Sequence, residues 1–138
     1  MLEYVQKCFR HYVDFSGRAR RKEYWFFVLF EILVIFVLTN LLGVFIALDS
    51  MGGVILTSVL LVIFALAVLL PGLAVVVRRL HDIDKSGGWY FINFIPFVGF
   101  IWFLVLMCKA GTVGENRYGA DPKNPEHNET ESLTNGAE

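Results

Sequence analysis

Residues 24–48 read YWFFVLFEILVIFVLTNLLGVFIAL, and this apolar run, which contains one charged residue, Glu31, decides the fold. As an α-helix it would be about 37 Å long, enough to cross a hydrocarbon core of about 30 Å with some tilt. Helices in a soluble core are shorter and amphipathic, whereas this run is apolar on all sides. It is also longer than the apolar region of about 7–15 residues in a cleaved signal peptide, so it predicts a retained membrane helix.

Two further apolar runs follow the first. Residues 51–77 carry no charge and include Pro71-Gly72, where we expect a kink whose freed carbonyl is satisfied by a neighbour. Residues 89–107 would be about 28 Å long as a helix, but they contain Pro96 and Gly99. This third segment either crosses the membrane or enters it and turns back near Pro96. The runs predict an all-α integral membrane protein with three hydrophobic helical segments.

The composition supports a membrane protein and excludes several other classes. The chain is 56% hydrophobic and 18% charged, against about 25% charged residues in a typical soluble domain. A formal net charge of −1 and the many apolar residues exclude a basic nucleic-acid-binding domain and a disordered chain. Two cysteines, Cys8 and Cys108, are too few for a disulfide framework and are not spaced as metal ligands.

The distribution of lysine and arginine predicts the orientation, because cytosolic connections carry the excess of these residues. Residues 1–23 hold six and residues 78–88 hold three, whereas residues 49–53 hold none. The N-terminus and the second connection are therefore expected in the cytoplasm. If residues 89–107 cross, three cations lie outside; if they turn back, all twelve lie inside. Charge favours turning back, but each half of such a turn would have only about seven to ten residues, so crossing is preferred.

The two ends of the chain differ in character. Residues 2–13 place apolar side chains at helical spacing and predict an amphipathic helix in the inner-leaflet interface, with packing on the helix bundle as the alternative. Residues 121–138 are acidic and broken by proline, which predicts a disordered tail. The remaining residues, 1–120, are expected to form a single membrane domain.

Two polar segments are the candidate functional sites. Residues 16–25 begin with a Ser16-Gly17 turn, a candidate helix cap, and place cations at headgroup level before an aromatic belt. Residues 78–89 end one helix with two arginines and open the next segment at Ser86-Gly87, where free N–H groups favour an anion. The candidates for binding an anionic headgroup or a partner protein are Arg18, Arg20, Arg21, Arg78, Arg79, His81, Asp82, Ser86 and Gly87.

The same residues have plainer interpretations. The cations serve as a topology signal, and His81, Asp82 and Asp84 can pair with the arginines of the head in a structural salt-bridge network. One histidine and two carboxylates lack a further ligand for a metal ion, and no nucleophile stands out. We therefore predict no catalytic residue, no metal and no cofactor.

Glu31 is the one ionisable residue well inside an apolar run, which makes it a functional hypothesis by default. Asn93 lies at a similar depth in the third segment, so a hydrogen bond between the two side chains would hold two helices together. Residues 111–119, which are rich in glycine, read as an ordered connector rather than as a phosphate-binding loop. This connector lies beside His81–Lys85 only if the third segment turns back.

Four motifs in the same order resemble a known family. They are GRARRKEYW at 17–25, RRLHD at 78–82, Trp89 with Ile95-Pro96, and GTVGENRYG at 111–119. The chain is similar, over residues 1–122, to the bacterial inner-membrane family named domain of unknown function 805. The resemblance implies a small multi-pass protein of the bacterial inner membrane and assigns no activity, and Glu31 lies outside the family pattern.

The sequence therefore predicts a non-enzymatic membrane protein whose basic cytosolic face meets anionic lipid or a protein partner. The alternative is a subunit of an oligomeric transporter or channel. Gly43 and Ala47 form a small-xxx-small pair that would suit close contact between helices, in a homo-oligomer or with another membrane protein.

Overall fold

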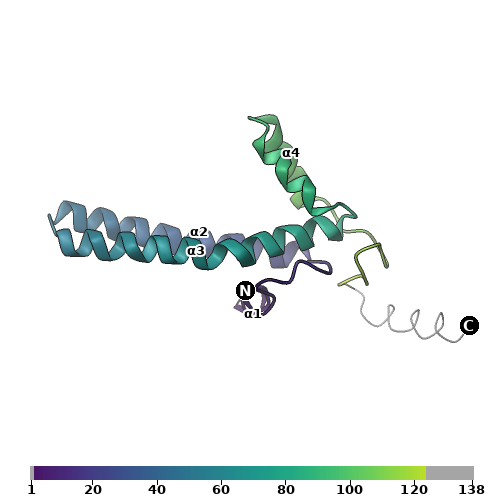
Figure 1. The fold of residues 1–138 in the computed structure, drawn as a ribbon, viewed down its shortest axis with the longest axis horizontal. Coiled ribbons are helices and arrows are strands. Elements are labelled where there is room, and N and C mark those ends of the chain that lie inside the picture. The colour runs from purple at the N-terminus through teal and green to yellow at the C-terminus, as the bar shows by residue number, and fades with distance from the viewer. Residues whose placement is uncertain (1, 124–138) are drawn as a thin grey trace, which may run out of the picture.

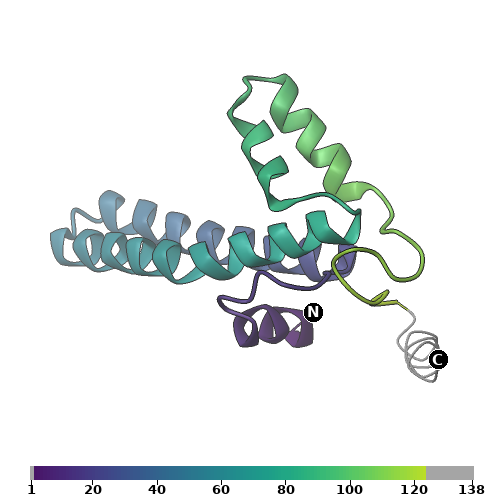
Figure 2. The ribbon, with the colours of Figure 1, turned by 45° about the vertical axis from the view of Figure 1, so that its right-hand side comes forward.

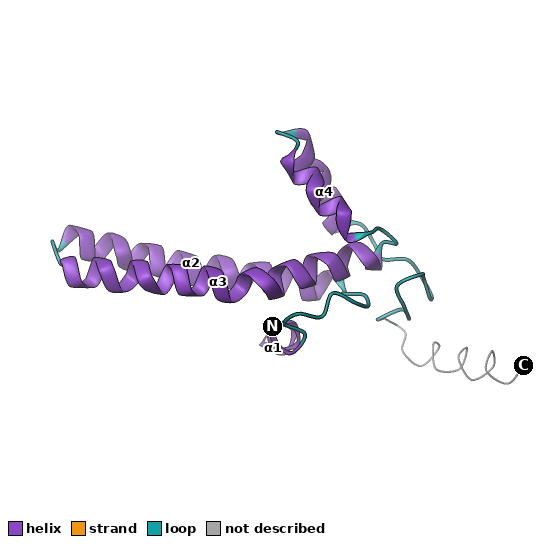
Figure 3. Ribbon diagram, viewed as in Figure 1, coloured by secondary structure: helices purple, strands orange, loops and turns teal. Residues whose placement is uncertain are grey.

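The computed structural model describes residues 2–123 and is all-helical, with no strand in that range (Figure 1; Figure 3). The protein is therefore an all-α membrane protein, as predicted. Its elements in chain order are α1 (Leu2–Arg10), α2 (Arg21–Ala47), α3 (Met51–Asp82), the 3₁₀-helix η1 (Gly87–Phe94) and α4 (Val98–Cys108).

The long helices α2 and α3 lie side by side and antiparallel, and they dominate the shape (Figure 1). With 27 and 32 residues they are about 40 and 48 Å long, enough to cross a bilayer. Their apolar side chains point outward along most of their length: Phe36 is 64% exposed and Ile63 is 57% exposed. A surface this apolar suits lipid rather than water.

The two helices are joined by a tight turn. Asp49 adopts a left-handed conformation, with φ at 53°, and the N–H of Ser50 donates to the carbonyl of Phe45 at 3.0 Å. Aspartate tolerates this conformation better than most residues, so a short connection between antiparallel helices is available without glycine.

Pro71 lies inside α3, and its missing N–H leaves the carbonyl four residues earlier, at Ala67, without its helical donor. The Tyr12 hydroxyl donates to this carbonyl at 2.8 Å. The expectation that a neighbouring group satisfies the freed carbonyl is confirmed. The donor comes from the segment just after α1, so the N-terminal region supplies the hydrogen bond that α3 lacks because of its proline.

The third apolar segment is not one helix. The η1 helix leads away from the end of α3, the chain turns at Pro96 and Phe97, and α4 runs back toward α3 (Figure 2). A Cβ on Gly99 would lie 1.8 Å from the carbonyl oxygen of Ile92, so glycine permits the close approach of the two limbs. Residues 89–107 are therefore not the single helix that the preferred crossing would use, and the break near Pro96 agrees with the alternative in which the segment turns back.

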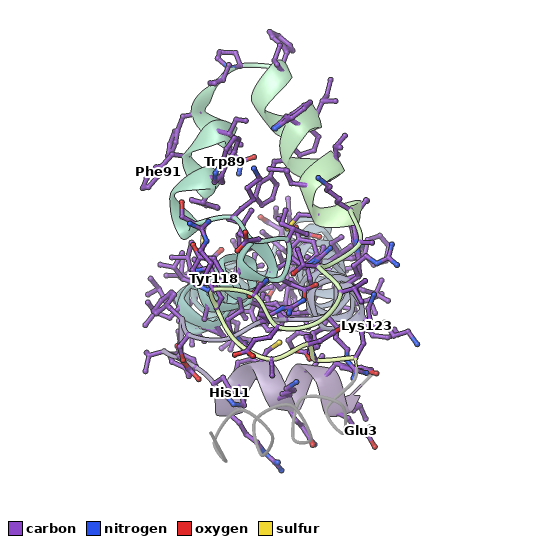
Figure 4. All side chains as sticks on the ribbon, turned by 90° about the vertical axis from the view of Figure 1, so that its right-hand side faces the viewer. Glu3, His11, Trp89, Phe91, Tyr118 and Lys123 are labelled. Atoms are coloured by element: carbon purple, nitrogen blue, oxygen red, sulfur yellow. The ribbon has the colours of Figure 1, made fainter. Side chains whose placement is uncertain are left out.

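The α1 helix lies across α2 and α3 rather than along them (Figure 4). Val5 and Cys8 are buried against the long helices, and the Phe9 ring lies 5.9 Å from that of Phe27. The apolar stripe predicted for the acyl boundary therefore packs mainly on protein, which is the alternative interpretation of residues 2–13. Leu2, 68% exposed, remains free to meet lipid.

The folded domain extends past residue 120. The N–H of Gly114 donates to the Asp121 carboxylate at 3.1 Å, and the carbonyl of Pro122 accepts a hydrogen bond from Arg20. Residues 121–123 are therefore part of the domain rather than of the predicted tail. The rest of that tail lies outside the described residues.

Candidate functional site

All the polar motifs meet at one end of the α2–α3 pair, which we call the basic end and define as residues 17–22, 78–85 and 107–123. Its centre is the Asp82 carboxylate, which two arginines contact from different directions. Arg18 approaches one oxygen at 3.0 Å and Arg79 approaches the other at 2.5 Å. The three side chains are at most 2% exposed, so this is a fully buried ion-pair triad.

Arg18 also holds the connector at residues 111–119. Its guanidinium donates to the carbonyls of Thr112 and Gly114, each at 2.5 Å. The N–H of Thr112 in turn donates to the carbonyl of Asp82 at 2.8 Å. A buried guanidinium needs acceptors for its five N–H groups, and backbone carbonyls of the connector supply them here.

Arg79 ties the end of α4 to α3. It donates to the carbonyl of Met107 at 3.3 Å and to that of Lys109. These acceptors lie at the C-terminus of α4, where carbonyls lack helical donors and favour a cation. Arg79 therefore attaches the C-terminal end of α4 to the C-terminal end of α3, the helix that precedes the hairpin.

Asn116 and Tyr118 add further contacts between the connector and α3. Asn116 donates to the carbonyl of His81 at 2.9 Å, and the His81 and Tyr118 rings stack with centroids 3.8 Å apart. Residues 111–119 therefore lie beside His81–Lys85, as expected for a segment that turns back. Gly111 is required there, because a Cβ at this position would lie 2.1 Å from a carboxylate oxygen of Asp82.

A second buried cluster lies between α1 and the long helices. Lys7 pairs with Glu23 at 2.6 Å, and the Glu23 side chain is 1% exposed. Arg78 is also buried, and two of its nitrogens have no hydrogen-bond partner within residues 2–123. Burial raises the pKa of the Cys8 thiol to about 11, an effect that the nearby Arg78 charge partly offsets. The pair of Lys7 and Glu23 was not predicted, because the spacing of these residues in the sequence gives no signal that they meet.

The predicted headgroup residues thus separate into internal and external groups. Arg18, Arg78 and Arg79 are buried within the protein, so their side chains are not exposed to bind a lipid headgroup. Arg21 and Lys22 are exposed at the start of α2. They line a groove of about 430 Å³, whose other lining residues are Trp25, Phe26, Leu29 and Cys108.

Other expected features of the basic end take different forms. Ser16 and Gly17 form a turn, in which the N–H of Ser16 donates to Asp14 at 2.9 Å, but α2 begins after Arg20 and has no side-chain cap. Asp84 pairs with Arg117 at 3.1 Å rather than with the head. Ser86 and Gly87 do open η1, and anion binding at this position stays a prediction.

Glu31 and Asn93 do not form the predicted hydrogen bond. The Asn93 amide donates to the carbonyl of Tyr90 at 3.0 Å, within η1. Glu31 faces α3 instead, with one carboxylate oxygen 3.3 Å from where a Cβ on Gly72 would lie. This pair therefore does not join α2 to η1, because the Asn93 side chain is hydrogen-bonded to the backbone of η1 itself.

Comparison with known proteins places the motifs in one family. The model of the family described as "Protein of unknown function (DUF805)" matches residues 12–120. The chain belongs to this family. The matched range begins at Tyr12 and ends just after the connector, so it contains all of the basic end except residues 121–123.

Three Escherichia coli K12 proteins are similar to the chain along nearly their full length. Inner membrane protein YhaH is 45% identical over 122 residues, which are 88% of this chain and 98% of YhaH. Inner membrane protein YhaI is 43% identical over 125 residues, covering 88% of this chain and 97% of YhaI. The uncharacterized protein YiiR is 26% identical over 151 residues, covering 88% and 94%. No solved structure matches the chain.

The structure gives a physical reason for the motifs that mark the resemblance. Three of the four motifs supply residues that meet around one buried carboxylate, that of Asp82. The other residues at this place are Arg18, Arg79 and Gly111. Within residues 2–123, no three His, Cys, Asp or Glu side chains are grouped as a metal ion would require. The motifs therefore build the basic end, and the side chains free to meet a ligand lie around it.

Proposed function

We propose that this inner-membrane protein spans the bilayer twice, with its N-terminus in the cytoplasm, and binds anionic phospholipid at its basic end. The distribution of charge supports the orientation. All twelve lysines and arginines lie in α1 or at the basic end, whereas the opposite turn carries only Asp49. Cytosolic connections are the ones that gather these residues.

The groove at the start of α2 carries the proposal of lipid binding. Arg21 and Lys22 are exposed at its polar end, and Trp25 and Leu29 continue one face of α2 toward the apolar part of the helix. A phospholipid has the same division, with an anionic phosphate followed by acyl chains. Tryptophan beside the cations suits the headgroup boundary.

We also propose a binding role rather than an enzymatic one. The acid of the RRLHD motif, Asp82, is occupied by two arginines, and His81 is stacked on Tyr118 with one ring nitrogen 3.1 Å from the carbonyl of Gly17. A general acid or base needs free access to a substrate proton, and these side chains are engaged with the protein.

The test is retention of lipid by the purified full chain. The protein is reconstituted in bilayers of phosphatidylcholine and phosphatidylglycerol, re-extracted, and its bound lipid is quantified by mass spectrometry. Each cation near a surface is worth about 1 kcal/mol, so Arg21→Gln with Lys22→Gln should weaken phosphatidylglycerol binding about thirtyfold. The control is Arg117→Gln with Lys123→Gln, which removes two exposed cations outside the groove. Equal retention by both double variants would refute the proposal.

A second candidate, a subunit of an oligomeric transporter or channel, has one supporting observation. Thr39, Asn40, Gly43 and Ala47 line a groove of about 420 Å³ on the outer face of α2. Small and amide-bearing residues on a lipid-facing surface suit contact with another helix. Cysteine crosslinking in the native membrane tests this candidate: residues introduced at 43 and 47 should crosslink between copies, whereas cysteines at 37 should not.

A further inference from the structure

A second cavity lies between α2, α3 and η1, next to the basic end but lined by none of its residues. It has a volume of about 320 Å³, and among its lining residues are Tyr24, Phe27, Glu31, Gly72 and Tyr90. Tyr90 is the lining residue that η1 supplies. The cavity could not be expected from the sequence, because it depends on how η1 packs on α3.

Glu31 is the one charged side chain in the cavity. Within the described part of the chain, the structure gives its carboxylate no hydrogen bond and no ion pair. It rests over Gly72, the position on α3 that leaves room for it. An unpaired carboxylate is costly at this depth, where a carboxylate normally has a partner.

Three aromatic side chains line the same cavity as Glu31. Tyr24 lies two turns before Glu31 on the same helix, Phe27 lies one turn before it, and Tyr90 approaches from η1. Aromatic faces attract cations, most strongly where water is excluded. A carboxylate beside several rings, in a cavity with apolar walls, therefore favours a cation that carries an apolar body.

We propose that this cavity binds a monovalent organic cation of the aryl- or alkylammonium class. The charged nitrogen lies against Glu31 and among the aromatic rings, and the apolar body lies along α3. The size of the cavity suits a ligand of about ten to fifteen heavy atoms, because ligand pockets of about 300 Å³ are at the small end of the usual range. This inference is independent of lipid binding at Arg21 and Lys22.

The test uses benzyltrimethylammonium and its neutral isostere neopentylbenzene, in which carbon replaces the charged nitrogen. Binding to the full chain is measured by calorimetry in micelles of an uncharged maltoside detergent, so that neither anionic lipid nor the ammonium headgroup of phosphatidylcholine takes part. The wild-type protein should bind the cation at least about tenfold more tightly than the isostere, because only the cation gains the carboxylate and the ring faces.

Variants assign the preference to the cavity. Glu31→Gln keeps the shape and should abolish the preference for the cation, whereas Asp49→Asn removes an acid at the distant turn and should leave it unchanged. Tyr90→Leu should weaken the binding of the cation more than the binding of the isostere. Equal affinity of the wild-type protein for the two probes, or an undiminished preference in Glu31→Gln, would overturn the inference. The first comparison needs no variant, so it remains decisive if Glu31→Gln fails to fold.

Discussion

Asp82 is the single residue on which the contacts of the basic end depend most. Each of its two oxygens contacts a buried arginine, and its backbone carbonyl accepts a hydrogen bond from the connector. A buried ion pair is weak evidence for stability in itself, since desolvation offsets much of the attraction. Removing one partner is different, because the remaining charges stay buried without compensation.

We therefore expect Asp82→Asn to destabilise the protein by about 3–5 kcal/mol, because Arg18 and Arg79 lose their shared counter-charge. The measurement is reversible unfolding in mixed micelles. The matched control is Asp84→Asn, whose pair with Arg117 has side chains 43% and 64% exposed and should contribute at most about 1 kcal/mol. A similar loss in both variants would contradict a special role for the buried triad.

The two cysteines should differ widely in reactivity. Cys8 is fully buried with a pKa raised to about 11, whereas Cys108 is exposed. The thiolate is the reactive form, and its fraction at pH 8 falls about tenfold for each unit by which the pKa rises. With one cysteine replaced by serine in turn, maleimide should modify Cys108 quickly and Cys8 slowly until the protein is unfolded. Comparable rates in the folded protein would show that α1 leaves α2 and α3 readily.

At the scale of the elements, α1 and α3 depend on each other through Pro71. The Tyr12 hydroxyl supplies the donor that this proline removes from Ala67. Tyr12→Phe should therefore lower the free energy of unfolding by about 0.5–1.5 kcal/mol, the usual net contribution of one hydrogen bond.

A double-mutant cycle isolates this bond. In a Pro71→Ala background the restored N–H can donate to Ala67, so Tyr12→Phe should lose most of its effect on the free energy of unfolding. An unchanged effect in that background would mean that the tyrosine acts through other contacts.

The helices themselves were predictable from sequence, because long apolar runs leave few alternatives. The path of residues 89–107 was not. Pro96 and Gly99 indicated the break. A crossing was preferred because each half of a turned-back segment would be short as an α-helix. The first half, η1, is instead a 3₁₀-helix, which rises about 2.0 Å per residue. The stripe of α1 was visible too, yet an apolar stripe has the same pattern whether it faces lipid or protein.

The candidate site was predictable only in part. Opposite charges at Arg18 and Asp82 suggested a pair, and the structure confirms it. The further acceptors are backbone carbonyls at Met107, Thr112 and Gly114, which carry no signature in the residue type. Burial of the arginines could not be inferred either, because the same cations would suit a membrane surface.

At the scale of the whole molecule, the returning hairpin brings Cys108 to the same end as the N-terminal helix. In a Cys8→Ser variant, a membrane-impermeant maleimide should therefore modify Cys108 in inside-out vesicles and leave it unmodified in intact spheroplasts. The exposure of this thiol makes the signal strong. Modification in spheroplasts would contradict the proposed cytoplasmic position of the basic end or the turning back of the third segment.

The buried triad also fixes an order of events during synthesis. Arg18 and Asp82 leave the ribosome before Thr112, which follows Asp82 by 30 residues. At about 5–20 residues per second, roughly 2–6 s pass between the synthesis of Asp82 and that of Thr112, whose carbonyl helps to complete the contacts of Arg18. During that interval the guanidinium groups at the basic end lack part of their hydrogen bonds. A chain truncated before residue 112 should therefore be recognised and degraded by membrane proteases, although both long helices are already made.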